Sequence, residues 1–494
     1  MSDKQFQRKI ASATKWSSIT QIIAKIITPL TNMILARILA PEAFGVIATI
    51  TMIVSFAEMF TDSGFQKYLV QHEFKNEEDK NNSSNVAFWS NLTLAFILWG
   101  VIAIFNEEIA EMVGNPGLGI VIIIACVQLP LSSFSSIQMA LYRRDFDFKT
   151  LFVVRVIGIF IPLLVTIPLA LIGLDYWSLI IGIICMQLFN AIFLTWRSKW
   201  KPSLFYDFKI FKKMYSFSVW SLVEAVSIWL TSWVDAFIIG YFLNQYYLGL
   251  YKTSTVMVTS LLALVTSAIV PVLFSTLSRL QNDNEKFKNM FFKFQRFVAV
   301  LVFPIGVGVY LYSDLATQLI LGNQWEEASS IIGLWALTSV IMIVFGHFSS
   351  EVYRSKGKPK LSFLAQVLHL IVLVPTVIIA ANYGFWPLVF ARAWIRMQFV
   401  LVHFIFMKYV MGFPIIKTIK NVVPSIVAVS FMAFFSYLLQ SISSHMMWSF
   451  ISIILCAVFY FVIIFLFPNV RAELIDVLDK ILPTRFLKRK KVTN

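Results

Sequence analysis

Fourteen apolar segments, separated by short polar connections, constrain this chain more than any other feature. Each is about twenty residues long, enough for a helix to cross about 30 Å of hydrocarbon. Backbone polar groups inside a bilayer have no water to bond, so helices are the expected form of such segments. With 58% hydrophobic residues, the composition excludes a soluble globular protein. We therefore expect an all-α integral membrane protein with fourteen transmembrane helices. The predicted spans lie near residues 16–39, 43–64, 84–105, 117–140, 150–172, 176–196, 214–241, 249–275, 295–312, 328–350, 361–381, 385–407, 422–441 and 446–467.

The basic residues alternate between the connections of these spans. The 41 Lys and Arg residues lie almost entirely in the N-terminus, the even-numbered connections and the C-terminus. Because cytoplasmic connections carry the excess of Lys and Arg, we expect both termini in the cytoplasm. The net charge of +15 is spread beside the helices, where it suits anionic lipid headgroups, and it predicts no nucleic-acid partner.

The spans and the outward connections carry no catalytic or metal-binding pattern. The three cysteines, Cys126, Cys185 and Cys456, lie inside apolar segments at no metal-ligand spacing. A membrane-bound glycan polymerase or transferase would need an outward catalytic loop that holds its reacting groups. The outward connections are short and contain no Asp-x-Asp or paired-His cluster. We expect a protein that is not an enzyme, with no catalytic residues and no metal site.

An internal repeat divides the chain into two copies. The matching positions are Trp16–Ser17 with Trp220–Ser221, Leu39 with Leu243, Gly45 with Gly249, and Tyr142–Arg143 with Tyr353–Arg354. Both copies start on the cytoplasmic side, so two six-helix lobes in parallel orientation are expected. Repeats of this kind occur in secondary transporters, whose substrate site lies between lobes near the midplane. The predicted domains are an N-lobe at 1–213, a C-lobe at 214–410, helices 13 and 14 at 411–470, and a basic amphipathic cytoplasmic tail at 471–494.

Ionisable residues inside the predicted spans are costly and usually face a bundle interior or a watery cavity. The cations are Lys25, Arg155, Arg392 and Arg396. Arg392 and Arg396 are four residues apart, so they are expected on one face of a helix. Guanidinium groups suit phosphate because they stay charged and donate bidentate hydrogen bonds. We therefore predict that these cations bind an anionic group, such as a lipid-linked phosphate, at mid-membrane depth.

Other interpretations of the intramembrane charges stay open. The charged side chains can pair with one another, Lys25 with Glu224 for example, and hold helices together. Long cationic side chains near helix ends can also reach the interface; the residues concerned are Arg37, Arg155 and Lys252.

The carboxylates within the spans also have two interpretations. Glu58, Glu224 and Asp235 are either structural counter-ions or coupling sites. A carboxyl group in a partly dry cavity can exchange protons near neutral pH, so a coupling ion such as H⁺ or Na⁺ is one of the two expectations.

Three short motifs resemble a known family. They are Leu35-Ala-Arg-Ile-Leu-Ala-Pro-Glu-Ala-Phe-Gly-Val46, Asp62-Ser-Gly-Phe-Gln-Lys-Tyr-Leu-Val-Gln71 and Tyr142-Arg-Arg-Asp-Phe-Asp-Phe-Lys149. In this order on a fourteen-helix chain, they are similar to the polysaccharide-exporting flippases of the multidrug/oligosaccharidyl-lipid/polysaccharide superfamily. The resemblance is strongest in the first 160 residues and closest to the O-antigen, teichuronic and colanic acid flippases.

The resemblance implies export by alternating access. Such proteins move undecaprenyl-(pyro)phosphate-linked oligosaccharide repeat units across a bacterial plasma membrane, for surface polysaccharides such as lipopolysaccharide or exopolysaccharide. The implied partners are the lipid-linked oligosaccharide, membrane lipids and a polysaccharide polymerase, with no cofactor beyond an H⁺ or Na⁺ coupling ion. The family's cationic cavity agrees in residue type with the four cations named above. The nearest alternative is a drug or cation antiporter of the multidrug and toxin extrusion (MATE) type, but the cationic balance and helices 13 and 14 favour an anionic substrate.

Overall fold

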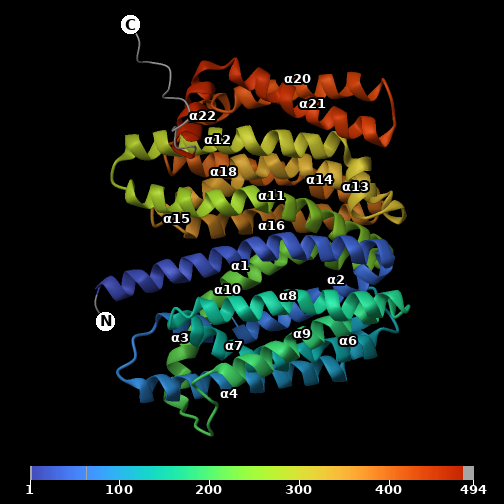
Figure 1. Ribbon diagram of the computed structural model, residues 1–494. Coiled ribbons are helices and arrows are strands. Elements are labelled where there is room, and N and C mark those ends of the chain that lie inside the picture. The colour runs from blue at the N-terminus through green and yellow to red at the C-terminus, as the bar shows by residue number, and fades with distance from the viewer. Residues whose placement is uncertain (1–2, 63, 482–494) are drawn as a thin grey trace, which may run out of the picture. The chain divides into compact units, whose positions relative to one another are not determined.

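The structure is a computed structural model that describes the backbone of residues 3–62 and 64–481. Within those ranges, some side chains in 3–22, 216–224 and 476–481, and that of Asp62, are not described. Helices are the only regular elements of the described ranges (Figure 1). The expected basic run of the tail lies outside the described residues.

The helices of the first half follow closely on one another. They are α1 (Asp3–Ile38), α2 (Pro41–Asp62), α3 (Phe65–Gln71), α4 (Glu77–Ile104), α5 (Asn106–Met112), α6 (Gly119–Cys126), α7 (Gln128–Arg144), α8 (Phe148–Leu171), α9 (Asp175–Arg197), α10 (Phe208–Phe242) and α11 (Gln245–Arg279). The second half contains α12 (Asn284–Leu311), α13 (Ser313–Ile320), the 3₁₀ turn η1 (Asn323–Trp325), α14 (Ala328–Met342), the π-helical turn η2 (Ile343–His347), α15 (Phe348–Ser355), α16 (Lys360–Ala381), α17 (Phe385–Trp394), α18 (Arg396–Tyr409), α19 (Ile415–Lys420), α20 (Val423–Gln440), α21 (Met446–Phe465) and α22 (Pro468–Ile481).

Fourteen helical segments of the described chain are long and apolar enough to cross a membrane, which confirms the predicted number. Three of them consist of consecutive pieces: Gly119–Arg144, Ala328–Ser355 and Phe385–Tyr409. The first is interrupted at Val127, where Pro130 removes a backbone donor and crowds the preceding turn. The second contains the π-helical turn η2, a rare element that is frequent at functional sites.

Asp and Asn side chains cap the N-termini of the helices that follow four of the even-numbered connections. Asn76, Asp147, Asp207 and Asp283 each accept a hydrogen bond from a backbone N–H in the first turn of α4, α8, α10 and α12. Such caps satisfy donors that the helix itself leaves unpaired. The polar connections therefore define where these helices begin.

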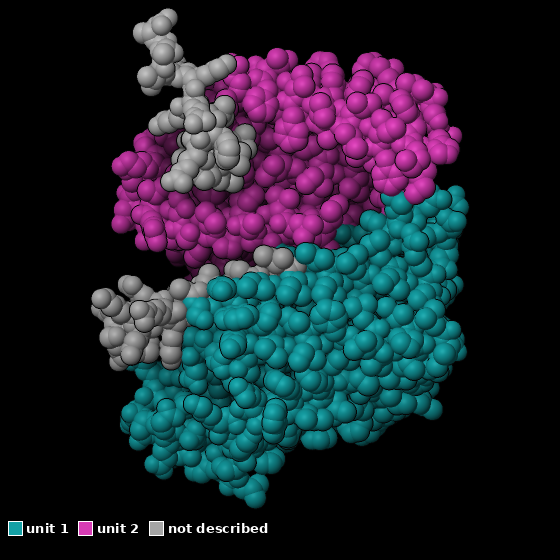
Figure 2. Space-filling view, viewed as in Figure 1, with its two compact units in different colours: residues 1–257, 318–328, 370–392 teal, residues 258–317, 329–369, 393–494 magenta. Residues whose placement is uncertain are grey.

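The chain forms two compact units (Figure 2). Unit 1 comprises residues 1–257, 318–328 and 370–392; unit 2 comprises residues 258–317, 329–369 and 393–494. The boundaries of these units differ from those of the repeat. For example, α10, which was expected to be the first helix of the C-lobe, lies in unit 1. The lobe boundaries at 213 and 410 stay a prediction.

Unit 1 is held together by close helix packing. α8 packs against both α1 and α9. Gly182 of α9 lies so close to α8 that an added Cβ would stand 1.9 Å from Thr166 Oγ1. Small residues allow such approach within membranes, where van der Waals packing replaces the hydrophobic effect between helices.

Unit 2 has an aromatic core around α12. The ring of Phe413 packs against Phe287, Phe291 and Phe292, with a centroid distance of 5.1 Å to Phe291. Further along α12, the hydroxyl of Tyr460 on α21 donates to the Val300 carbonyl at 2.9 Å. A backbone carbonyl and a buried hydroxyl thus satisfy each other inside the apolar bundle.

Candidate functional site

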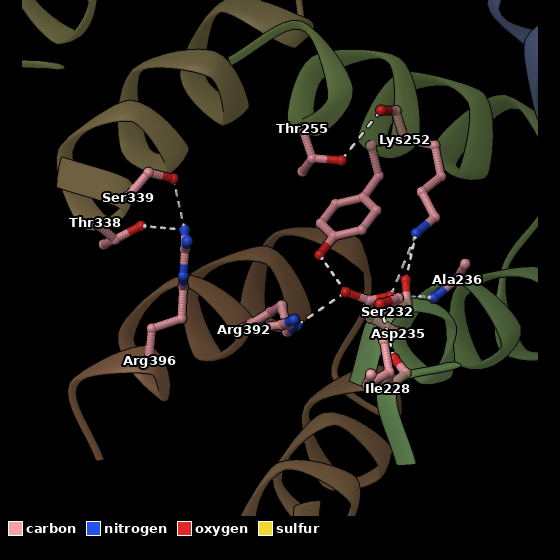
Figure 3. Close-up of polar contacts among 11 residues, drawn as sticks. Ile228, Ser232, Asp235, Ala236, Lys252, Thr255, Thr338, Ser339, Arg392 and Arg396 are labelled. Atoms are coloured by element: carbon pink, nitrogen blue, oxygen red, sulfur yellow. Dashed lines mark hydrogen bonds and ion pairs between the residues drawn. The ribbon is translucent and has the colours of Figure 1, made fainter. Parts of the chain in front are cut away.

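Asp235 of α10 is the centre of a buried charge cluster in unit 1 (Figure 3). Its Oδ2 accepts hydrogen bonds from Arg392 Nε of α17 at 2.9 Å and from the Tyr251 hydroxyl of α11 at 2.7 Å. Its Oδ1 accepts from the backbone N–H of Ala236 at 2.8 Å and lies 3.7 Å from Lys252 Nζ. The side chains of Asp235 and Arg392 are 4% and 8% exposed, so the pair is almost dry.

Lys252 of α11 completes this cluster. Its ammonium group donates to the Ser232 carbonyl at 2.8 Å and lies 4.1 Å from the centre of the Trp233 ring. Ser232 precedes Asp235 by nearly one turn of α10, so the lysine reaches both from the neighbouring helix. The cluster joins α10, α11 and α17, and two cations share one carboxylate within it.

Arg396, the first residue of α18, belongs to a second polar group in unit 2 (Figure 3). Its Nη1 donates to Thr338 Oγ1 at 3.2 Å and to Ser339 Oγ at 2.8 Å, both on α14. The guanidinium carbon lies 4.3 Å from the centre of the Trp335 ring. Hydroxyl groups and an aromatic face orient a guanidinium without removing its charge, and such stacking suits arginine.

The other predicted site residues are dispersed over unit 1. Lys25 is half-buried on α1, Arg155 is exposed on α8, and Glu58 is half-buried on α2. The side chain of Glu224 lies outside the described residues, and so does its expected pairing with Lys25. From the predicted set, the structure pairs Asp235 directly with Arg392.

Sequence spacing alone did not show the partners of these charges. Arg392 and Arg396, expected side by side toward one anion, have different partners: a carboxylate and a pair of hydroxyls. For Lys252 both interface contact and charge pairing were open interpretations, and its ammonium group lies 3.7 Å from the carboxylate of Asp235. Tyr251 had no distinguishing signal in the sequence, because only the three-dimensional packing brings it to the carboxylate.

The motif Tyr142–Lys149 forms the turn after the fourth predicted span. Arg144 Nη1 donates to the backbone carbonyls of Leu69, Val70 and His72, at 2.8, 3.3 and 2.7 Å. These carbonyls end α3, where the helix has no internal donor for them. One arginine thereby fixes the C-terminus of α3.

The imidazole of His72 lies beside this helix end. Its Nε2 is 3.3 Å from Lys213 Nζ. Partial burial, followed by the positive charge of Lys213, holds the pKa of His72 below its ordinary value of 6.5. The neutral ring is therefore the form that fits this turn.

Comparison with known proteins gives consistent matches. Residues 34–330 match the model of a family described as polysaccharide biosynthesis protein. The succinoglycan biosynthesis transport protein ExoT of Rhizobium meliloti is 25% identical over 309 residues, which are 63% of this chain and 62% of ExoT. The match thus spans less than two thirds of the length of that relative.

Two solved structures share the fold. The lipid II flippase MurJ in its inward closed conformation has a TM-score of 0.73 at 15% identity, over 92% of this chain and 98% of MurJ. An inward-facing MATE family transporter of the MOP superfamily has a TM-score of 0.60 at 14% identity, over 80% of this chain and 97% of the transporter. At these identities the likeness concerns the fold.

The family match covers more than half of the chain, and the helix number and the fold agree with it. The family expected from the motifs is therefore confirmed. The chain belongs to the polysaccharide biosynthesis protein family and has the fold of the MOP-superfamily transporters.

Proposed function

We propose that the chain is a flippase that exports an oligosaccharide linked to undecaprenyl phosphate or pyrophosphate across the bacterial plasma membrane, by alternating access, for surface polysaccharide synthesis. The family match over residues 34–330 carries this proposal. The names of a transport protein for succinoglycan biosynthesis and of a lipid II flippase support it. We also propose that both termini are cytoplasmic, on the basis of the alternating Lys and Arg residues.

The intramembrane charges favour an anionic substrate group. Arg396 is a candidate to contact a phosphate, because hydroxyls and an aromatic ring orient its guanidinium. Arg392 is a weaker candidate, since its Nε already donates to Asp235. Lys25 and Arg155 would add positive charge along unit 1.

Asp235 acts in this proposal as a counter-ion to Arg392 and Lys252. Two cationic groups already surround its carboxylate, which leaves less attraction for a third cation. Glu58 and Glu224 stay the candidates for a coupling site, with H⁺ or Na⁺ as the ion. The proposed partners are the lipid-linked oligosaccharide, membrane lipids and a polysaccharide polymerase, and no catalytic step is assigned to the chain.

The test is an analysis of lipid-linked sugars in cells that lack this chain. We expect a complete prenyl-linked repeat unit to accumulate on the cytoplasmic leaflet. Re-expression of the Arg396→Ala variant should fail to clear the pool although the protein reaches the membrane. Arg396→Lys should clear it in part, because the charge is kept and the bidentate geometry is lost.

Lys408→Ala is the matched control, because Lys408 is an exposed cation on the same helix. It should clear the pool as the wild type does. An unchanged lipid-linked pool together with altered sensitivity to cationic drugs would overturn the proposal in favour of a MATE-type antiporter.

A further inference from the structure

Two glycines make an unusually close helix crossing in unit 1. Gly45 of α2 faces α11 so closely that a Cβ at this position would lie 1.9 Å from the Gln245 carbonyl oxygen. Gly249 of α11 faces α2 in the same way, and its Cβ would lie 1.8 Å from the Pro41 carbonyl oxygen. No side chain larger than hydrogen fits either position without moving the backbone of the other helix.

The crossing is symmetric in the internal repeat. Gly45 and Gly249 align between the two copies, and so do Pro41 and Gln245, which stand four residues before them. Each glycine therefore contacts the carbonyl of the residue that begins the other helix. Two repeat-related helices meet through equivalent atoms, as a pseudo-twofold axis requires.

A second contact joins the C-terminus of α1 to the segment around η1, again within unit 1. Trp325 Nε1 donates to the Ala36 carbonyl at 2.7 Å, and Gln324 Nε2 donates to the Leu39 carbonyl at 2.9 Å. In return, the Arg37 guanidinium donates to the Leu319 carbonyl at the end of α13. Each helix end thus receives its cap from the other segment.

The repeat-related helix end makes a corresponding contact. Gly240, near the end of α10, aligns with Ala36 of α1 in the first copy. A Cβ on Gly240 would lie 2.5 Å from the Val113 carbonyl oxygen, and one on Gly114 would lie 1.5 Å from the Gly240 carbonyl oxygen. Backbone therefore packs on backbone at this helix end also.

These contacts lie in the first, third, seventh and ninth connections or at the helix ends next to them, which the charge pattern places on the outer side of the membrane. We propose that these contacts form an outward gate of the transport path, and that Gly45 and Gly249 are the residues that allow it to close. The role of this gate in releasing the substrate to the outside rests on the proposed function. It closes through backbone contacts and helix caps, so opening breaks hydrogen bonds that water outside can replace.

The gate predicts what a methyl group does at the crossing. An alanine at position 45 or 249 prevents the two helices from approaching fully, which favours the open state. The reporter is Thr49→Cys, because Thr49 lies one turn below Gly45 on α2 and is 1% exposed. The native Cys126, Cys185 and Cys456 are replaced by alanine in this background.

The measurement is the labelling rate of this cysteine in intact cells, with a membrane-impermeant thiol reagent added outside. We expect slow labelling with both glycines present and a rise of at least about tenfold with Gly45→Ala or Gly249→Ala, equivalent to about 1.4 kcal/mol in the closed–open equilibrium. Gly100→Ala is the control, because a Cβ on Gly100 of α4 meets nothing within 4 Å. It should leave the rate unchanged.

Trp325→Phe gives a second route to the same state if the alanine variants do not reach the membrane. Phenylalanine keeps an aromatic side chain but lacks the indole N–H that donates to the Ala36 carbonyl, so labelling should again rise. Unchanged labelling in correctly inserted glycine variants, or an equal rise with Gly100→Ala, would overturn the gate. Glycine-dependent labelling in a chain that exports no oligosaccharide would keep the gate and reject the proposed function.

Discussion

Replacing Asp235 by Asn removes the one carboxylate that Arg392 and Lys252 share. Asn keeps the shape of the side chain and can still accept from Tyr251, so the main change is charge. Breaking a buried ion pair by removing one partner costs about 3–5 kcal/mol, because the remaining charge is left in a poorly solvated position. Two cations are left here, so we expect a loss of unfolding free energy near the upper end of that range.

The assay is unfolding of the purified protein in mixed micelles at increasing SDS, followed by tryptophan fluorescence. The double variant Asp235→Asn/Arg392→Gln should lose less than the sum of the two single losses, since the groups contact each other. A stability of Asp235→Asn within about 0.5 kcal/mol of wild type would refute the counter-ion role. If export were lost at that unchanged stability, Asp235 would instead be a coupling site.

Three further outcomes follow from contacts described above. Lys252→Met leaves one cation for Asp235, so its loss of unfolding free energy in the same assay should be smaller than that of Asp235→Asn. Arg144→Gln removes the donor to three carbonyls and should speed amide exchange at the end of α3, whereas Lys149→Gln, an exposed change in the same motif, should not. The fold lowers the pKa of His72, so the unfolded chain binds a proton at this residue before the folded chain does as the pH falls. The stability of the folded state should therefore decline below about pH 6.5. His72→Gln should flatten this decline in thermal unfolding scans.

Apolar length and charge alternation predicted the fourteen spans, because both properties are read along the chain. The repeat gave Gly45 and Gly249 as equivalent positions, although it could not show that they face each other. Asp235 and Arg392 were recognised separately as intramembrane charges. Their pairing depends on which helices are neighbours, and no local pattern in α10 or α17 records that.

The backbone of the tenth span was also beyond prediction. The segment Ala328–Ser355 is mostly apolar, and its propensities do not distinguish a π-helical turn from an α-helical one. A Cβ built on Gly346 of η2 would lie 2.7 Å from Met342 Cε, in the preceding turn, and 3.7 Å from His403 Cδ2 of α18.

Because of that π-helical turn, the exact number of residues in the tenth span determines which way its later side chains point. One residue of an α-helix turns the chain by about 100°. The extra residue of a π-helical turn therefore changes the direction, about the helix axis, of every side chain that follows it. Tyr353 lies after η2 and reaches His403, with 3.2 Å from its hydroxyl to Nδ1. Deletion of a single residue within η2 would leave a regular helix that still spans the membrane, but it would rotate Tyr353 away from its histidine. We therefore expect that single-residue insertions and deletions are tolerated in the connections but not within this span.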